Sequence, residues 1–198
     1  MLKEINYYAI ILKSQFVTIL TINKTKEKIN MKRTQKRTAF IVESALIAGI
    51  YAAVTYFVAP VSFGAQQFRV SEALTVLPAL TPNAIPGLTI GCMIANINSP
   101  YGAIDVVCGT LATFLAAVCT RYTRNIKIKE LPLLSFIFPV LFNAVIIGLE
   151  LSYFMPEGFT FISFLSISLS VAFGEAVVCY ILGIPLYAGL KRTKIFER

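Results

Sequence analysis

The sequence contains no histidine, and only 14% of its 198 residues are charged. Without histidine, the chain has no imidazole metal ligand, no Ser-His catalytic pair and no histidine proton relay. The phosphate-binding pattern G-x-x-x-x-G-K-[ST] is also absent, so the chain is not expected to bind and hydrolyse ATP in that way. Neither disulfides nor metal sites are expected, because the four cysteines lie alone in apolar runs without C-x-x-C spacing: Cys92, Cys108, Cys119 and Cys179.

Hydrophobic residues make up 57% of the chain, and the mean hydropathy is +0.73. A soluble domain carries about 25% charged residues, so the composition predicts an integral membrane protein. The net charge is +8, but the basic residues cluster at the ends of apolar runs. That arrangement is typical of topology signals rather than of a nucleic-acid-binding face. The expected surroundings are therefore membrane lipid, with no nucleic acid partner.

The number of membrane crossings follows from the apolar runs and the basic clusters. Four runs are clear: 39–59, 103–120, 131–151 and 161–190. Residues 72–97 form either one long kinked helix or two short crossings that turn at Pro82-Asn83. With six crossings every basic cluster faces the cytoplasm, whereas with five the clusters that begin at Arg121 and Lys191 lie outside. We therefore predict an all-α bundle of six transmembrane helices with both termini in the cytoplasm.

The first thirty residues differ from the rest. Their apolar run, residues 5–22, is broken by Lys13, Ser14 and Gln15, and a lysine-rich polar run follows. A signal peptide requires a continuous apolar core and a small-residue cleavage site. Met31 begins a segment typical of the start of a membrane protein. We predict an extension over residues 1–30, disordered or lying on the membrane surface, and a membrane domain over residues 31–198.

The first predicted crossing carries small side chains at helical spacing. On a helix they make one smooth stripe that lets another helix approach closely. The stripe contains five residues: Ala45, Ala48, Gly49, Ala52 and Ala53. Two interpretations stay open, packing within the bundle and docking onto a separate membrane subunit.

Polar side chains recur near the predicted outer ends of the helices. Such groups are costly at membrane depth and by default mark a functional site. The topology brings seven to one level, with Glu175 deeper in the last helix: Gln67, Arg69, Glu72, Asn96, Asp105, Asn143 and Glu150. A pocket open to the outside is the simplest explanation. Two alternatives remain, an internal pair between Arg69 and Glu72 and a contact of Glu43 with the nearby basic cluster.

Three classes of function can be weighed against these residues. Acidic pairs such as Glu150 with Glu175 suit acid–base catalysis, but no nucleophile motif or metal spacing accompanies them. The inverted repeats common in secondary transporters are not evident. A purely structural protein would leave the acids unexplained. The sequence therefore indicates a non-enzymatic binding subunit that needs a partner to move its cargo.

Three segments resemble a known family: GAQQFRVSEALTVLP at 64–78, AIPGLTIGCMIAN at 84–96 and DVVCGTLATFLAA at 105–117. They are similar to the QueT family of substrate-binding S-components of energy-coupling factor (ECF) transporters, which are associated with queuosine precursors. The resemblance covers Met31 to Lys191. It implies the six-helix S-component fold, a place in the plasma membrane of a prokaryote and no cofactor. It also implies three partners, a transmembrane coupling protein and two cytoplasmic ATPases, with the small-residue stripe as the docking face.

The ligand implied by the resemblance is a 7-deazaguanine, foremost 7-aminomethyl-7-deazaguanine. Its N1–H and exocyclic amine suit a carboxylate, its O6 suits an amide or Arg69, and its aminomethyl cation calls for a second carboxylate. The acids and amides above supply these groups. Aromatic faces for stacking are expected from Phe68, Tyr101, Phe142 and Tyr153. An S-component for another vitamin or heterocycle is the alternative.

Overall fold

The structure, a computed structural model, describes the backbone of residues 2–58, 69–128, 130–156, 158–193 and 195–196. The chain divides into two compact units, Met1–Val42 and Glu43–Arg198. Both are helical, and the described residues contain no strand beyond an isolated bridge between Ile128 and Leu131. The predicted all-α class is therefore confirmed for the described part of the chain.

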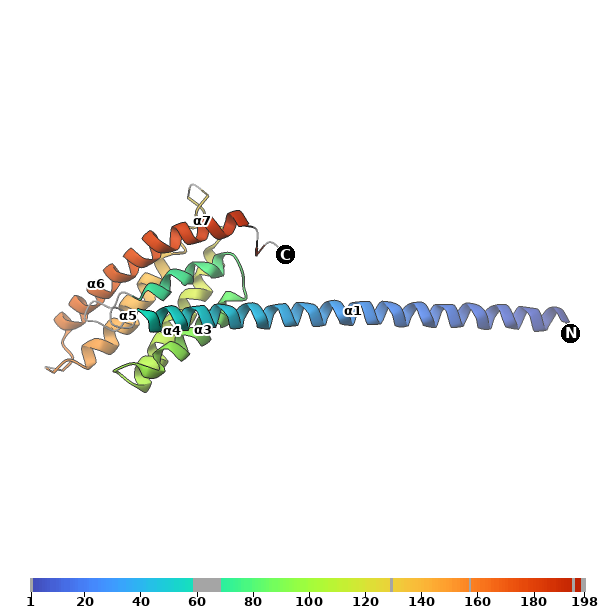
Figure 1. Cartoon of the computed structure of the whole chain (residues 1–198), viewed down its shortest axis with the longest axis horizontal. Coiled ribbons are helices and arrows are strands. Elements are labelled where there is room, and N and C mark those ends of the chain that lie inside the picture. Colours follow the sequence, from blue (N-terminus) through green and yellow to red (C-terminus); the bar gives the residue numbers. More distant parts are fainter. Residues whose placement is uncertain (1, 59–68, 129, 157, 194, 197–198) are drawn as a thin grey trace. The chain divides into compact units, whose positions relative to one another are not determined.

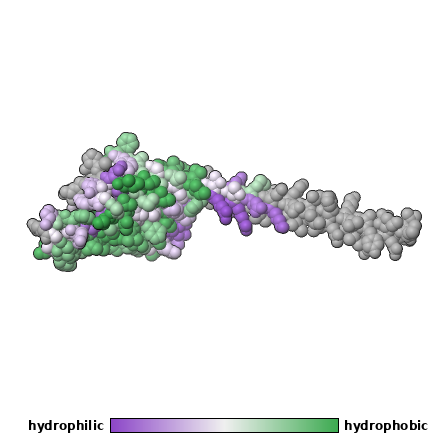
Figure 2. All heavy atoms as spheres, turned by 90° about the horizontal axis from the view of Figure 1, so that it is seen from below, coloured by the Kyte–Doolittle hydropathy of each residue, from purple (hydrophilic) through white to green (hydrophobic). Residues whose placement is uncertain are grey.

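Helix α1, Leu2–Phe57, begins in the first unit and ends in the second (Figure 1). In the first unit, every described side chain from residue 30 to residue 42 is exposed. This segment contains four basic residues, Lys32, Arg33, Lys36 and Arg37, which suits the hydrophilic colouring of these side chains in Figure 2.

In the second unit, the described residues form the end of α1 and eight further helical segments. Each main helix packs against the next along the chain, α3 on α4, α4 on α5 and α5 on α6, while η1 packs on α4 and η3. The segments are η1 (Val70–Ala79), α3 (Ala84–Ala95), η2 (Asn96–Asn98), α4 (Ala103–Thr123), α5 (Ile137–Tyr153), α6 (Phe161–Val177), η3 (Val178–Gly183) and α7 (Ile184–Thr193).

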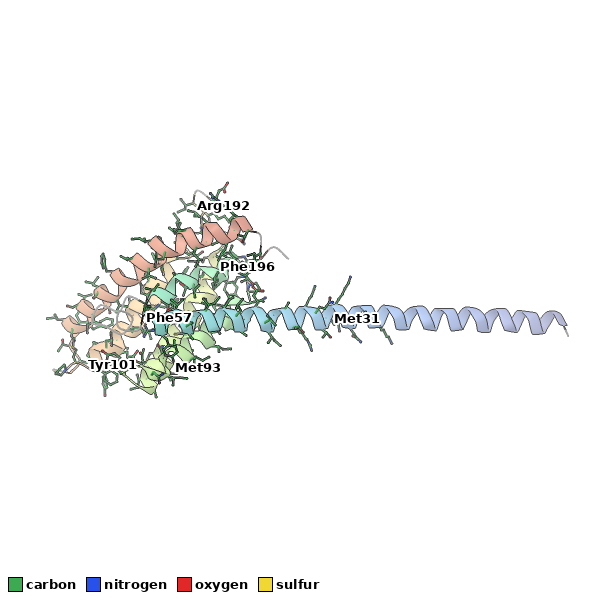
Figure 3. The ribbon with its side chains drawn as sticks, in the orientation of Figure 1. Met31, Phe57, Met93, Tyr101, Arg192 and Phe196 are labelled. Carbon is green, nitrogen blue, oxygen red and sulfur yellow. The ribbon has the colours of Figure 1, made fainter. Side chains whose placement is uncertain are left out.

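Among the described residues, three helical stretches are long and apolar enough to cross a membrane: Asn30–Phe57, Ala103–Thr123 and Phe161–Thr193. Three shorter helices are also apolar: Val70–Ala79, Ala84–Asn98 and Ile137–Tyr153. Large apolar side chains are exposed over the second unit, including Phe57 and Met93, which Figure 3 labels. Figure 2 shows such hydrophobic side chains gathered on one face of this unit. Exposed apolar patches of this kind suit a lipid environment.

The helices differ from the sequence prediction in three places. Residues Val70–Ala79 form a 3-10 helix, with the Leu80 amide donating to the Leu77 carbonyl at 2.8 Å. Pro78 lies inside this helix and has no N–H for an α-helical bond. The helix predicted over 131–151 begins only at Ile137, because the preceding residues form turns such as the Ser135 amide to the Pro132 carbonyl. A π-helical turn, η3, interrupts the predicted last helix.

Close packing between α1 and α3 depends on two glycines of α3. A Cβ at Gly87 would lie 2.8 Å from the Ser44 carbonyl oxygen, and one at Gly91 would lie 2.9 Å from the Ala48 carbonyl oxygen. The absent side chains let the two helices touch along their backbones. This contact fixes the end of α1, which carries Tyr51, against the helices that hold the polar site.

Candidate ligand-binding site

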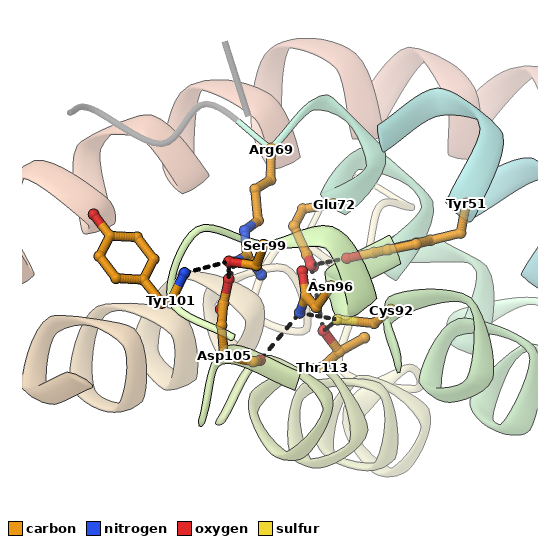
Figure 4. Close-up of polar contacts among 9 residues, drawn as sticks. All are labelled: Tyr51, Arg69, Glu72, Cys92, Asn96, Ser99, Tyr101, Asp105 and Thr113. Carbon is orange, nitrogen blue, oxygen red and sulfur yellow. Dashed lines mark hydrogen bonds and ion pairs between the residues drawn. The ribbon is translucent and has the colours of Figure 1, made fainter. Parts of the chain in front are cut away.

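The site is organised around an ion pair between Arg69 and Asp105. Arg69 directly precedes η1, Asp105 lies in the first turn of α4, and the two are 2% and 1% exposed. The Arg69 Nη2 atom donates to Asp105 Oδ1 at 3.0 Å. The Ser99 hydroxyl donates to Asp105 Oδ2, and the Tyr101 amide donates to Ser99 Oγ at 3.3 Å (Figure 4). Among the described residues, the ion pair of Arg69 is therefore with Asp105 rather than with Glu72.

The ion pair keeps Arg69 charged. Burial acts to lower the pKa of the guanidinium, but the Asp105 carboxylate, with further negative groups around it, more than offsets this and raises that pKa above its ordinary value. Arg69 is therefore a fixed cation inside the bundle. Its Nε and Nη1 atoms are buried and have no hydrogen-bond partner among the residues that the structure describes.

Asn96 connects the end of α3 to the start of α4. Its Nδ2 atom donates to the Asp105 carbonyl oxygen at 3.2 Å and to Cys92 Sγ at 3.5 Å. The amide thus holds the backbone of the residue whose side chain binds Arg69. Asn96 is buried, as the prediction of a polar site residue requires.

Glu72, in the first turn of η1, is fully buried. Its Oε1 atom accepts hydrogen bonds from the Tyr51 hydroxyl and, at 3.3 Å, from Thr113 Oγ1 (Figure 4). Its Oε2 atom has no partner within the described part of the chain. One oxygen is therefore held in place while the other remains available to a ligand.

Helix α5 supplies the least satisfied groups. Asn143 and Glu150 are seven residues apart, which places them on one helical face, and both are buried. None of their side-chain nitrogen and oxygen atoms has a hydrogen-bond partner in the described residues. On α6, Glu175 is also buried and accepts only a weak contact from Cys179 Sγ at 4.0 Å among the described groups.

Unpartnered buried polar atoms are rare in folded proteins and each needs an explanation. At the candidate site they belong to Arg69, to Glu72 of η1 and to two residues of α5, while Glu43, Thr110 and Ser168 each carry one elsewhere. Arg69 acts electrostatically on Glu72, Glu150 and Glu175, so these charges share one region of the bundle. Together they present donors and acceptors that a polar ligand could satisfy.

Most of the predicted polar site residues are thus buried. The predicted aromatic residues differ from them in position. Tyr101 lies beside the ion pair through its backbone, while its ring packs on Phe154 with centroids 5.6 Å apart. Tyr153 is 71% exposed and does not line the polar site. Phe142 stacks on Phe138. Gln67 and Phe68 lie outside the described residues.

Three hydroxyl side chains of the site were not anticipated: Tyr51, Ser99 and Thr113. Each donates to one of the buried carboxylates. Their only signal in the sequence is a hydroxyl group in or next to an apolar helix, which many other residues share. Glu43 Oε2 accepts a hydrogen bond from Asn83 Nδ2 at 2.7 Å. The alternative contact of Glu43 with the basic cluster stays a prediction.

The small-residue stripe of α1 divides between two environments. Ala48 and Ala52 are buried inside the second unit, whereas Ala45, Gly49 and Ala53 are exposed. A Cβ at Gly49 would meet no atom within 4 Å of the described structure. The two buried residues therefore suit packing within the bundle, and the three exposed residues leave docking onto a separate subunit open.

Metal ions and apolar ligands would need other kinds of site. No group of three or more Cys, Asp or Glu residues in the described part of the chain could hold a metal ion. A groove of about 320 Å³ between α3 and α4 is lined by apolar side chains such as Met93, Val107 and Phe114. It contains none of the predicted ligand-binding residues.

Comparison with known proteins gives two matches. A sequence model of the family described as QueT transporter matches residues 41–192. The chain is also 36% identical over 83 residues to the queuosine precursor transporter QueT of Lactococcus lactis subsp. cremoris (strain MG1363). That alignment covers 41% of this chain and 48% of the relative, which is about half of its length. No solved structure gives a significant match.

Proposed function

The chain belongs to the QueT transporter family, and we propose that it is the membrane-embedded substrate-binding subunit of an ECF transporter that imports a queuosine precursor. The proposed ligand is a 7-deazaguanine, foremost 7-aminomethyl-7-deazaguanine, taken from a pocket that opens to the outside. One observation carries the proposal: buried donors and acceptors of Arg69, Glu72, Asn143 and Glu150 lack partners in the described residues. A member of a transporter family is not an enzyme, and ATP hydrolysis is assigned to the partners.

The charges of the site favour a cationic ligand. Four acids, Glu72, Asp105, Glu150 and Glu175, are buried in the same bundle as Arg69, and Asp105 already pairs with it. An ionised carboxylate inside a protein is costly unless it is paired. The aminomethyl group of the proposed ligand is positively charged at neutral pH and would compensate one of the remaining acids. This balance supports the aminomethyl form over uncharged 7-deazaguanines.

The hydrogen bonds of the base can be matched to the same groups. N1–H and the exocyclic amine are adjacent donors, which one carboxylate can accept together. The O6 atom is an acceptor for the Nε or Nη1 atom of Arg69, or for the amide of Asn143. We assign the acids Glu72, Glu150 and Glu175 to the donors of the ligand. Asn96 and Asp105 hold Arg69 in place, and Gln67, Phe68 and Tyr101 complete the proposed site.

The partners are proposed from the family and from the exposed part of the stripe. A transmembrane coupling protein would dock on Ala45, Gly49 and Ala53, where small side chains leave room for a closely packed helix. Two cytoplasmic ATPases would drive transport through the coupling protein. Ala48 and Ala52 would support this face from within the bundle.

The proposed topology has six membrane crossings with both termini in the cytoplasm of a prokaryote. The three short apolar helices would cross together with the three long ones. Residues 1–30 are proposed to be an N-terminal extension that takes no part in ligand binding, and residues 31–198 to be the membrane domain.

Uptake measurements test this function. Cells that express the chain with the coupling protein and ATPases should accumulate labelled 7-aminomethyl-7-deazaguanine, and cells that express the chain without these partners should not. Excess unlabelled ligand should compete, whereas riboflavin and guanine should not. If riboflavin competes and unlabelled 7-deazaguanine does not, the chain binds another class of substrate.

A further inference from the structure

Gly109 occupies an unusual position beside the ion pair. It lies in α4, four residues after Asp105 and therefore on the same helical face. A Cβ at Gly109 would lie 3.1 Å from Arg69 Nη1 and would overlap Asn96 Nδ2. The missing side chain thus leaves the space that the guanidinium and the amide occupy.

The two neighbours of Gly109 cannot move away freely. Arg69 is held by Asp105 Oδ1 at 3.0 Å, and Asn96 is held by the Asp105 carbonyl oxygen at 3.2 Å. All of these groups are buried. A methyl group at position 109 would therefore break or bend at least one of these hydrogen bonds.

The close-packed glycines of α3 have a different role. The nearest atoms to a Cβ at Gly87 are the Ser44 carbonyl oxygen and the Cβ of Ile47, at 2.8 and 2.9 Å, as expected where two helices touch. At Gly109 the nearest atoms are polar ends of two side chains of the candidate site. Glycine is among the least favourable residues inside a helix, so its presence in α4 calls for such a local reason.

We propose that Gly109 is a positioning residue of the ligand site, which sets the direction in which Arg69 presents its Nε and Nη1 donors to the ligand. The proposal rests on the proposed function, because it assigns those two donors to the O6 atom of a 7-deazaguanine. Gly109 does not touch the ligand. It acts through Arg69: a Cβ at position 109 would push Nη1 by a few tenths of an ångström and would displace Asn96, which holds the backbone of Asp105, the ion-pair partner of Arg69.

The proposal predicts a change in ligand preference. The probe pair is 7-aminomethyl-7-deazaguanine and its 6-thio counterpart, in which sulfur, a much weaker acceptor, replaces the carbonyl oxygen that accepts from Arg69 while the N1–H donor is kept. Wild-type protein should prefer the 6-oxo ligand by about tenfold or more, as a hydrogen bond from a charged donor implies. Gly109→Ala should lose most of this preference, because the displaced guanidinium no longer reaches O6.

Calorimetric titration of the purified full-length protein tests this with both ligands. Arg69→Lys should also lose the preference, and Gly109→Ala added to Arg69→Lys should change it little further, since both act through one group. Gly87→Ala is the matched control, because it adds a methyl group at an equally tight contact away from the ion pair. It should lower thermal stability but leave the preference intact.

The possible results separate the two proposals. If wild-type protein binds neither ligand, the proposed function fails. If wild-type protein prefers the 6-oxo ligand and Gly109→Ala keeps that preference, or if the two substitutions are additive, only the role of Gly109 is overturned. If Gly109→Ala does not accumulate as folded protein, it is combined with Asn96→Ala, which removes the nearest clash. The ligand preference of this double variant is then compared with that of Asn96→Ala alone. A retained preference in that pair would equally overturn the role.

Discussion

The buried acids of the bundle differ in how many of their carboxylate oxygens have hydrogen-bond partners. Asp105 has a partner for each carboxylate oxygen, Arg69 for one and Ser99 for the other. Glu150 has none among the described residues, although both of its oxygens are buried. The first pattern suits a structural anchor and the second suits a ligand contact. Removing the charge of Asp105 should therefore lower the stability of the protein, whereas removing the charge of Glu150 should lower ligand affinity.

Glu150→Gln should weaken binding of 7-aminomethyl-7-deazaguanine at least tenfold, which corresponds to about 1.4 kcal/mol. The reason is that the amide no longer compensates the cation or accepts from the base at both oxygens. Ligand-free protein should be no less stable, because a buried charge without a partner is removed. Calorimetric titration measures the affinity, with Glu130→Gln as the control on an exposed acid. Unchanged affinity would exclude Glu150 from the site.

Asp105→Asn should destabilise the ligand-free protein by about 3 kcal/mol, because Arg69 would remain buried without its anion. A thermal unfolding series in detergent, with Glu130→Gln beside it, measures this loss. A stability equal to that of Glu130→Gln would show that the ion pair does not hold the site together.

For individual residues, the useful signal was the scarcity of polar side chains in the apolar segments. In so apolar a chain, a buried acid or amide needs a reason, and that argument selected Arg69, Glu72, Asp105 and Glu150 before any contact was known. It did not select the pairings. Spacing offered Glu72 only as an alternative partner of Arg69, whereas the ion pair is with Asp105, which the packing of α4 against η1 brings near.

Helix α1 presents two small-residue faces, one expected to pack within the bundle and one expected to dock a partner. Ala48 is buried against α3, while Gly49, the next residue, is exposed and faces open space. Replacing each by leucine changes the same helix at adjacent positions. The two variants therefore separate packing of the bundle from docking of a partner.

Gly49→Leu should prevent assembly with the coupling protein and leave ligand affinity unchanged, because its added side chain meets no atom of the described bundle. Ala48→Leu should instead destabilise the protein itself by about 1–3 kcal/mol through overpacking against α3. Co-purification of the coupling protein measures the first effect and thermal unfolding the second. Normal co-purification of Gly49→Leu would place the docking face elsewhere.

Helical segments were easier to predict than their geometry. Apolar runs and the Pro82-Asn83 turn located most helices of the second unit, since hydrophobic length is a strong signal. The 3-10 form of η1 and the π turn η3 carry no such signal. They pack against each other, with a Cβ at Gly183 only 2.7 Å from Val76 Cγ1, so tertiary contacts set their backbone form.

At the scale of the whole molecule, the family resemblance found in the sequence is confirmed, and its implied all-helical membrane fold agrees with the apolar helices. The six-crossing topology remains a prediction from the basic clusters. It places the link between η2 and α4 outside and the end of α4 inside. Both regions carry exposed residues that can be labelled.

A cysteine at position 98 should react in intact cells with a membrane-impermeant maleimide, whereas a cysteine at position 122 should react only after the membrane is opened. Asn98→Cys and Tyr122→Cys provide the two sites, since both native side chains are exposed. The unsubstituted chain, with its four native cysteines, gives the background. Reaction of both sites from the outside would contradict the six-crossing topology.

The central claim is that the buried acids around Arg69 bind a cationic 7-deazaguanine. The most direct measurement is calorimetric titration of the purified protein with 7-aminomethyl-7-deazaguanine and with the uncharged 7-cyano-7-deazaguanine. The charge balance predicts saturable binding of both, with the aminomethyl form at least about tenfold tighter. Failure to bind any 7-deazaguanine, or equal affinity for the charged and uncharged forms, would contradict it.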